Sequence, residues 1–131
     1  MQTEWAAAPL FTPPKRRRGA PQRVGESHVG RRSVVSFVGE LDIASAPDLE
    51  RALTRAIERG ATDVWTDLSS TTFMDSSGVH CLLRTHRMLR ELRRRFAVIC
   101  GDGPVRRVLT LTRADAVLEL HADRTTAHRA A

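Results

Sequence analysis

The stretch FMDSSG, residues 73–78, separates a strand-like segment from a helix-like one. Upstream, TDVWTDL at 62–68 is short and rich in apolar residues, which predicts a buried strand. Downstream, apolar residues recur at helical spacing between Val79 and Leu89, which predicts an amphipathic helix. The adjacent hydroxyls of Ser76 and Ser77 therefore lie where a strand gives way to the start of a helix.

The same alternation of strands and helices extends outward in both directions. The expected elements, in chain order, are a strand at 33–38, a helix at 45–60, a strand at 62–68, a helix after 78, a strand at 95–100, a short helix from 104 and a strand at 116–120. Ser45 is the expected N-cap of the first helix. Such alternation favours an α/β fold with a small mixed or mostly parallel β-sheet backed by α-helices.

Length and composition predict one domain with two tails. The 131 residues suffice for a single modest core, which we place at 25–122. Residues 1–24 form a basic extension rich in proline and arginine, which we expect to be disordered. We expect residues 123–131 to be a frayed C-terminal tail. The extension carries +4 of the net charge of +6, so the predicted domain is nearly balanced and nucleic-acid binding is unlikely on charge grounds.

Location and thiol chemistry follow from what the sequence lacks. No apolar run approaches the roughly 20 residues that span a bilayer, and the N-terminus lacks a signal-peptide pattern. We therefore expect a cytoplasmic protein without a membrane partner. Cys81 and Cys100 lie within apolar patterns without metal-ligand spacing, so we expect two buried, reduced thiols.

Residues alone leave two roles open for the serine pair and argue against a third. Asp75 or a serine can cap the helix, which is worth about 1 kcal/mol. The free backbone N–H groups of a helix start also suit a phosphate. A catalytic serine is disfavoured because G-x-S-x-G is absent, His80 shares the serine's helix and no third orienting group is evident. We therefore expect no enzyme, and no cofactor or metal, because phosphate loops, paired catalytic carboxylates and metal clusters are also absent.

Three segments together resemble one known family. They are GELDIASAPDLERAL (39–53), DLSSTTFMDSSGVHCLL (67–83) and PVRRVLTLTRADAVLEL (104–120). In this order they look like the STAS family, and specifically like the bacterial anti-sigma factor antagonists. The resemblance covers roughly residues 28–121 and implies a STAS-like fold in a single domain.

The resemblance implies a switch based on phosphorylation. Family members that lack phosphate bind an anti-sigma factor that is also a serine protein kinase, and this frees a sigma factor for transcription. The kinase phosphorylates the first serine of D-S-S-G, which matches Ser76 here, and a PP2C-type phosphatase restores binding. The resemblance also implies a partner-binding surface. We expect it to include Glu40, Asp42, Ser45, Phe73, Met74, Asp75, Ser77, Gly78 and His80. Two alternatives stay open: Phe73 and Met74 could pack the loop from below, and Glu40, Asp42 and Ser45 could be ordinary turn and cap residues.

Some positions depart from the family pattern. His80 stands where relatives usually have a small residue, and Arg113 stands where a glycine often follows L-T. The glycine pair often found before the third core strand is replaced by arginines at 93–95. Two other hypotheses stay open. One is a STAS interaction module of another signalling assembly, in which Ser76 is not phosphorylated. The other is a nucleic-acid-associated protein that uses the basic extension and the arginine-rich helix.

Overall fold

The computed structural model of the protein describes residues 22–131. The predicted basic extension therefore lies outside the described residues, except for its last three. Of these, Arg23 and Val24 already belong to the first strand, so regular structure begins slightly earlier than the sequence indicated.

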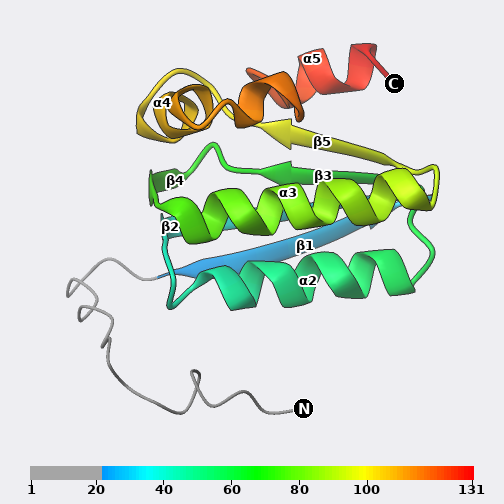
Figure 1. The fold of residues 1–131 in the computed structure, drawn as a ribbon. Coiled ribbons are helices and arrows are strands. Elements are labelled where there is room, and N and C mark those ends of the chain that lie inside the picture. The colour runs from blue at the N-terminus through cyan, green and yellow to red at the C-terminus, as the bar shows by residue number, and fades with distance from the viewer. Residues whose placement is uncertain (1–21) are drawn as a thin grey trace.

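A mixed β-sheet forms the centre of the domain (Figure 1). Its strands are β1 (Arg23–Val29), β2 (Arg32–Leu41), β3 (Asp63–Asp67), β4 (Thr71–Met74), β5 (Arg95–Ile99) and β6 (Glu119–His121). The main order is β1-β2-β3-β5-β6, with β1 antiparallel to β2 and the later pairs parallel. β4 pairs in parallel with the last residues of β2, beyond the segment that pairs with β3. The carboxyl ends of the parallel strands therefore share one edge of the domain.

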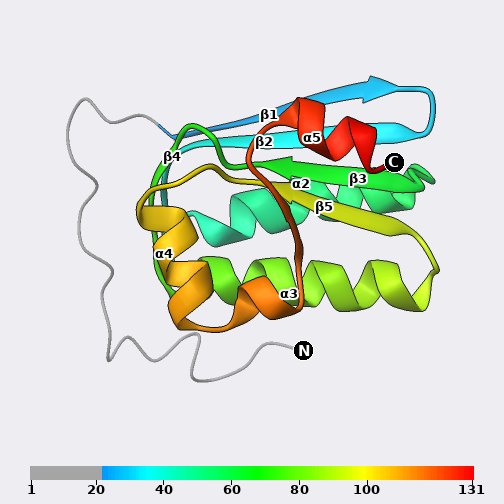
Figure 2. The ribbon, with the colours of Figure 1, turned by 90° about the horizontal axis from the view of Figure 1, so that it is seen from above.

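Helices cover both faces of this sheet. They are α2 (Ala46–Glu58), α3 (Ser76–Glu91), α4 (Pro104–Leu111), the 3-10 helix η1 (Ala114–Ala116) and α5 (Arg124–Arg129). Figure 2 shows α2 and α3 side by side below the sheet and α5 above it. α4 and η1 connect β5 to β6, and α4 packs beside β4.

The main core lies between the sheet and the α2–α3 layer. Leu49 and Leu53 of α2 and Leu82 and Leu89 of α3 are fully buried with Phe37 of β2 in one hydrophobic cluster. Burying side chains of this size stabilises the fold by about 1.5–3 kcal/mol each. The helical spacing of these leucines produces the apolar stripes that the sequence showed.

A smaller cluster lies on the other face. Trp65, Ala97 and Ile99 are buried there together with Ala127 of α5. The Trp65 ring lies 4.3 Å from the Arg32 guanidinium, and its Nε1 donates a 2.8 Å hydrogen bond to Asp63. Such cation–π contacts contribute about 0.5–2 kcal/mol.

The fold class is confirmed, and the central strands and the α2 and α3 helices lie where the sequence predicted them. Two strands were not anticipated, namely the largely exposed β1 and the short β4. The strand expected at 116–120 begins later, at Glu119, because η1 extends to Ala116 and a turn follows it.

The C-terminal segment also differs from expectation. We expected residues 123–131 to be frayed, but Arg124–Arg129 form α5. The Asp123 side chain accepts a 2.8 Å hydrogen bond from the Thr126 backbone N–H, and Ala127 is buried against the sheet. A side-chain cap and one apolar anchor hold this short helix. Within residues 22–131, every helix is too short or too polar to cross a membrane.

Candidate functional site

Asp75 organises the start of α3. Its extended backbone conformation precedes the helix, and its carboxylate accepts a 2.8 Å hydrogen bond from the Ser77 N–H. Its carbonyl accepts from the N–H groups of Gly78 and Val79, at 3.1 and 3.3 Å. Its own N–H donates to Leu41 at the end of β2, at 3.2 Å. Asp75 thus acts as the predicted N-cap and also ties the helix start to the sheet.

Ser76 is the first residue of α3, and it is exposed. Its neighbour Ser77 is half-buried, and the Ser77 N–H is already bonded to Asp75. Of the two hydroxyls, the Ser76 hydroxyl is therefore the more accessible. It lies at the positive end of the helix dipole, which stabilises a negative group there by about 0.3–1 kcal/mol. This location suits a hydroxyl that receives a phosphoryl group.

Met74 and Gly78, which we expected at the partner-binding surface, are buried beneath it. Met74 is 2% exposed, and Gly78 is buried in the first turn of α3. A Cβ at Gly78 would lie 2.5 Å from Met74 Cγ and 3.0 Å from two side-chain atoms of Leu41. The glycine therefore lets α3 approach the ends of β2 and β4, and these two residues support the surface from beneath.

Ser45 is likewise internal. It is fully buried, and its hydroxyl donates to the Glu40 carbonyl at 2.7 Å and accepts from the Asp42 N–H at 2.9 Å. It occupies the N-cap position of α2, but its side chain bonds to this turn rather than to the helix. Asp42 Oδ1 accepts from the N–H groups of Ala44 and Ser45, each at 3.0 Å. These bonds fix the turn between β2 and α2.

The remaining predicted residues share one surface. Parallel pairing of β2 with β4 places Glu40 opposite Phe73, next to the start of α3. Phe73 is 47% exposed, and Glu40 is partly exposed. His80 is exposed one helical turn after Ser76, which places the two side chains on the same side of α3. These side chains, with Asp42 and Asp75, form what we call the Ser76 surface.

Two further residues matter here, and the sequence pattern did not single them out. Ile43, in the turn after β2, is 44% exposed, and it is a large apolar residue in a turn that otherwise reads as polar. Asp67, from the D-L-S segment, accepts from Ser69 N–H and Oγ and from Arg124 Nε, at 2.9, 2.6 and 2.6 Å. Burial opposes ionisation of Asp67, but these bonds outweigh it and hold the pKa of the carboxyl below its ordinary value.

The described residues offer little support for chemistry of other kinds. Burial raises the pKa of the Cys81 thiol to about 12 and also raises that of Cys100, so neither thiol is an activated nucleophile. Residues 22–131 contain no group of three or more potential metal ligands.

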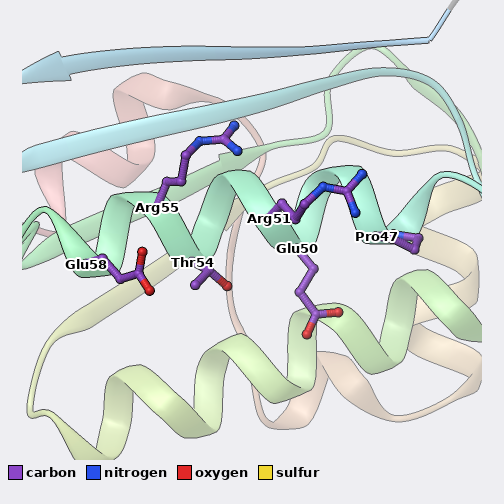
Figure 3. A pocket seen from close by; sticks show the side chains of 6 residues that line it. All are labelled: Pro47, Glu50, Arg51, Thr54, Arg55 and Glu58. Atoms are coloured by element: carbon purple, nitrogen blue, oxygen red, sulfur yellow. The ribbon is translucent and has the colours of Figure 1, made fainter. Parts of the chain in front are cut away.

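A shallow hollow along α2 is also an unconvincing site (Figure 3). It is lined by Pro47, Glu50, Arg51, Thr54, Arg55 and Glu58. Arg51 pairs with Asp48, Arg55 with Glu26 and Glu50 with Arg84. Much of the charge in this hollow is therefore already matched within the protein.

Comparisons with known proteins identify the family. The family model of the STAS domain matches residues 21–127. The chain belongs to the STAS domain family. The matched range ends within α5.

Similar proteins are anti-sigma factor antagonists. The anti-sigma-B factor antagonist of Staphylococcus aureus is 27% identical over 78 residues, which are 60% of this chain and 72% of that protein. An anti-sigma factor antagonist from Mycobacterium paratuberculosis is 28% identical, with a TM-score of 0.79 over 86% of this chain and 95% of that one. The phosphorylated form of the Bacillus cell fate determinant SpoIIAA is 23% identical, with a TM-score of 0.64 over 83% and 100% of the chains. This last likeness bears on the fold alone.

Proposed function

We propose that this STAS protein is an anti-sigma factor antagonist that binds an anti-sigma factor serine kinase and is released by phosphorylation of Ser76. The kinase would transfer the γ-phosphoryl group of ATP to Ser76 Oγ. The bond between Pγ and the bridging oxygen breaks, ADP leaves, and the hydroxyl proton is lost. A PP2C-type phosphatase would hydrolyse the phosphoserine and restore binding.

The observation that carries the proposal is the exposed Ser76 hydroxyl at a capped helix start. Exposed Phe73 and Ile43 offer apolar contact area, and Glu40 and Asp42 add polar groups around them. An apolar centre with a polar rim is the usual composition of a protein interface. The antagonists of Staphylococcus aureus and Mycobacterium paratuberculosis support the same assignment by similarity.

Charge explains how one phosphate would end the interaction. A phosphoserine adds about −1.5 to −2 charge at neutral pH. At Ser76 it would lie beside Asp75 and near Glu40, so an interface that buried it unpaired would lose several kcal/mol. Ser76 is exposed and its hydroxyl supports no core contact, so the fold would stay the same.

The proposal is tested with three baits, the wild-type protein, Ser76→Ala and Ser76→Asp. We expect wild type and Ser76→Ala to capture an ATP-binding anti-sigma factor from the native cell lysate, and Ser76→Asp to bind that purified partner at least tenfold more weakly. The purified partner should transfer phosphate from ATP to wild type and to Ser77→Ala, but not to Ser76→Ala. Equal binding of the partner to all three baits, without phosphate transfer, would contradict the proposal.

A second candidate is a STAS interaction module that is never phosphorylated. The observation in its favour is the exposed His80, one turn after Ser76, where relatives usually carry a small residue. A bulky ring there narrows access to the Ser76 hydroxyl. This candidate predicts that the same partners bind all three baits and that no captured kinase phosphorylates wild type, whereas His80→Ala, which removes the ring beside Ser76, becomes a substrate.

A further inference from the structure

Gln22 shows where the N-terminal extension joins the domain. Its Nε2 donates a 2.7 Å hydrogen bond to the Glu40 carbonyl, and the next residue, Arg23, pairs with Val38. The carbonyl that follows, that of Leu41, accepts from the Asp75 N–H. Figure 1 shows the start of β1 at the same end of the domain as β4 and the start of α3. The extension therefore joins the domain beside the Ser76 surface.

Chain length sets how far the basic run of the extension can reach. Gln22 adjoins β2, and Ser76 follows β4, the neighbour of β2, so the two residues are separated by roughly 10–15 Å. An extended chain advances about 3.3–3.6 Å per residue. Arg18 can thus reach up to about 14 Å from Gln22, and Lys15 up to about 25 Å, before side-chain length is added. The chain that connects the run Lys15–Arg18 to Gln22 is therefore long enough for the run to contact Ser76.

Charge complementarity favours that contact once Ser76 carries phosphate. The Ser76 surface holds three carboxylates, those of Glu40, Asp42 and Asp75. A phosphate dianion there would add to this negative charge. The run supplies one lysine and three arginines, and arginine presents paired N–H donors that match phosphate oxygens.

Three arginines of α2 and α3 are less available, because each already pairs with a carboxylate of the domain. Arg51 pairs with Asp48, Arg55 with Glu26 and Arg84 with Glu50. A group tethered by four to seven residues has an effective concentration in the millimolar range, so a modest contact is sufficient. Connectivity therefore favours the run as the partner of a phosphate on Ser76.

We propose that the basic run Lys15–Arg18 binds the phosphate of phosphorylated Ser76 within the same molecule. This inference rests on the proposed function, because it requires phosphate on Ser76. The bound run would cover the phosphate and the rest of the Ser76 surface. It would thereby slow the phosphatase and prolong the state in which the antagonist is inactive.

The test uses full-length protein with phosphoserine placed at position 76 during translation, so no kinase is needed. The second pKa of the phosphate, ordinarily near 6, is followed by 31P NMR. Cations in contact favour the dianion and lower this pKa. We expect it to rise by about half a unit or more when Lys15, Arg16, Arg17 and Arg18 are all changed to Gln. The difference should shrink in 0.5 M salt.

A control variant removes four positive charges that lie far from Ser76. Arg31, Arg87, Arg90 and Arg129 are exposed and lie away from the start of α3, and their change to Gln should leave the phosphate pKa near its wild-type value. An unchanged pKa in the run variant, or an equal rise in both variants, overturns the inference. A shift that grows with protein concentration overturns it too, because the run would then come from another molecule. Neither result bears on the binding test with Ser76→Asp, so the two proposals fail separately.

Discussion

Asp75 at the start of α3 and Arg93 just beyond its end show how differently the chain treats the two ends of one helix. Asp75 caps the helix with its side chain and joins it to β2 through its backbone. Arg93 follows the C-cap residue Leu92 and adopts φ of +59°, a left-handed conformation that costs an L-residue about 1–2 kcal/mol. The start of α3 is thus held by specific hydrogen bonds, whereas its end is followed by a residue in a strained backbone conformation.

The same contrast recurs in other helices of the described domain. Asp123 caps α5 with its side chain. Arg113, just beyond α4, has φ of +63°, whereas Gly60, just beyond α2, has φ of +91° at little cost. Helix starts follow the carboxyl ends of strands, where Ser76 lies, and helix ends lead back to the opposite edge. The starts of α3 and α5 thus have side-chain caps, whereas those of α2 and α4 have none.

Gly78→Val should reduce the free energy of unfolding the most, because it disrupts the packing at the start of α3. The new side chain must displace Met74 and Leu41 from positions already within 3.0 Å of a Cβ, so we expect a loss of about 3 kcal/mol. Urea unfolding followed by circular dichroism measures this loss. Ser76→Val places the same side chain on the exposed surface, and it should cost under about 1 kcal/mol. Equal losses in the two variants would show that the first turn of α3 is not tightly packed.

Asp67→Asn tests the tie between a strand end and the start of α5. The carboxylate accepts hydrogen bonds from Ser69 and Arg124. We therefore expect Asp67→Asn to lower the free energy of unfolding by about 1–2 kcal/mol at pH 7. Because folding lowers the pKa of Asp67, its contribution is present above the unfolded pKa of about 3.9 and is lost as pH falls through the folded value.

Urea unfolding at pH 7 and at pH 3 checks both parts of this prediction. The difference in the free energy of unfolding between wild type and Asp67→Asn should be large at pH 7 and should decrease as the pH falls. Asp115→Asn, at an exposed position in η1, is the control and should produce little change at either pH. A gap of constant size would show that ionisation of Asp67 contributes nothing.

Asp75→Ala should cost about 1 kcal/mol, because it removes the side-chain acceptor of the Ser77 N–H. Asn is as good an N-cap as Asp, so Asp75→Asn should restore most of this stability. Thermal unfolding measures both variants. If Asp75→Asn is as unstable as Asp75→Ala, the negative charge rather than the cap stabilises this helix start.

Arg93→Gly and Arg113→Gly should have the smallest effect and the opposite sign. Glycine adopts positive φ without steric cost, so each change relieves strain in the folded state. Glycine also raises the entropy of the unfolded chain, which offsets part of this gain. We expect a net increase of about 0.5 kcal/mol in the free energy of unfolding. Arg93→Ala and Arg113→Ala remove the side chain but keep the strain, and they should gain nothing. Urea midpoints resolve the difference. A gain with alanine would instead implicate repulsion among the arginines.

Much of the fold could be predicted because α2 and α3 each bury one face and the central strands β3 and β5 are buried on both. The leucines of α2 and α3 repeat at helical spacing, and the strands at 33–38, 62–68 and 95–100 are dense in β-branched and apolar residues. β1 escaped prediction because it is an edge strand with mostly exposed residues, so it carries no apolar alternation. α5 escaped because a single alanine anchors it.

The candidate site could be predicted only in part. Local rules located the helix start and offered Asp75 as a cap, whereas the choice of Ser76 over Ser77 came from the resemblance to the STAS family. The inward positions of Ser45, Met74 and Gly78 depend instead on β2 and β4 lying side by side, which chain order does not reveal. The role of Asp67 required knowing that α5, more than fifty residues later, returns to β3.

Trp65 gives the protein a built-in optical probe. Its ring is buried beneath α5, beside Arg32, and its indole N–H is bonded to Asp63. The other tryptophan of the chain is Trp5. In a Trp5→Phe protein, fluorescence would therefore come from Trp65 alone, and its emission would shift to longer wavelength when α5 leaves the sheet. Detachment of the C-terminal helix could then be followed separately from unfolding of the main core.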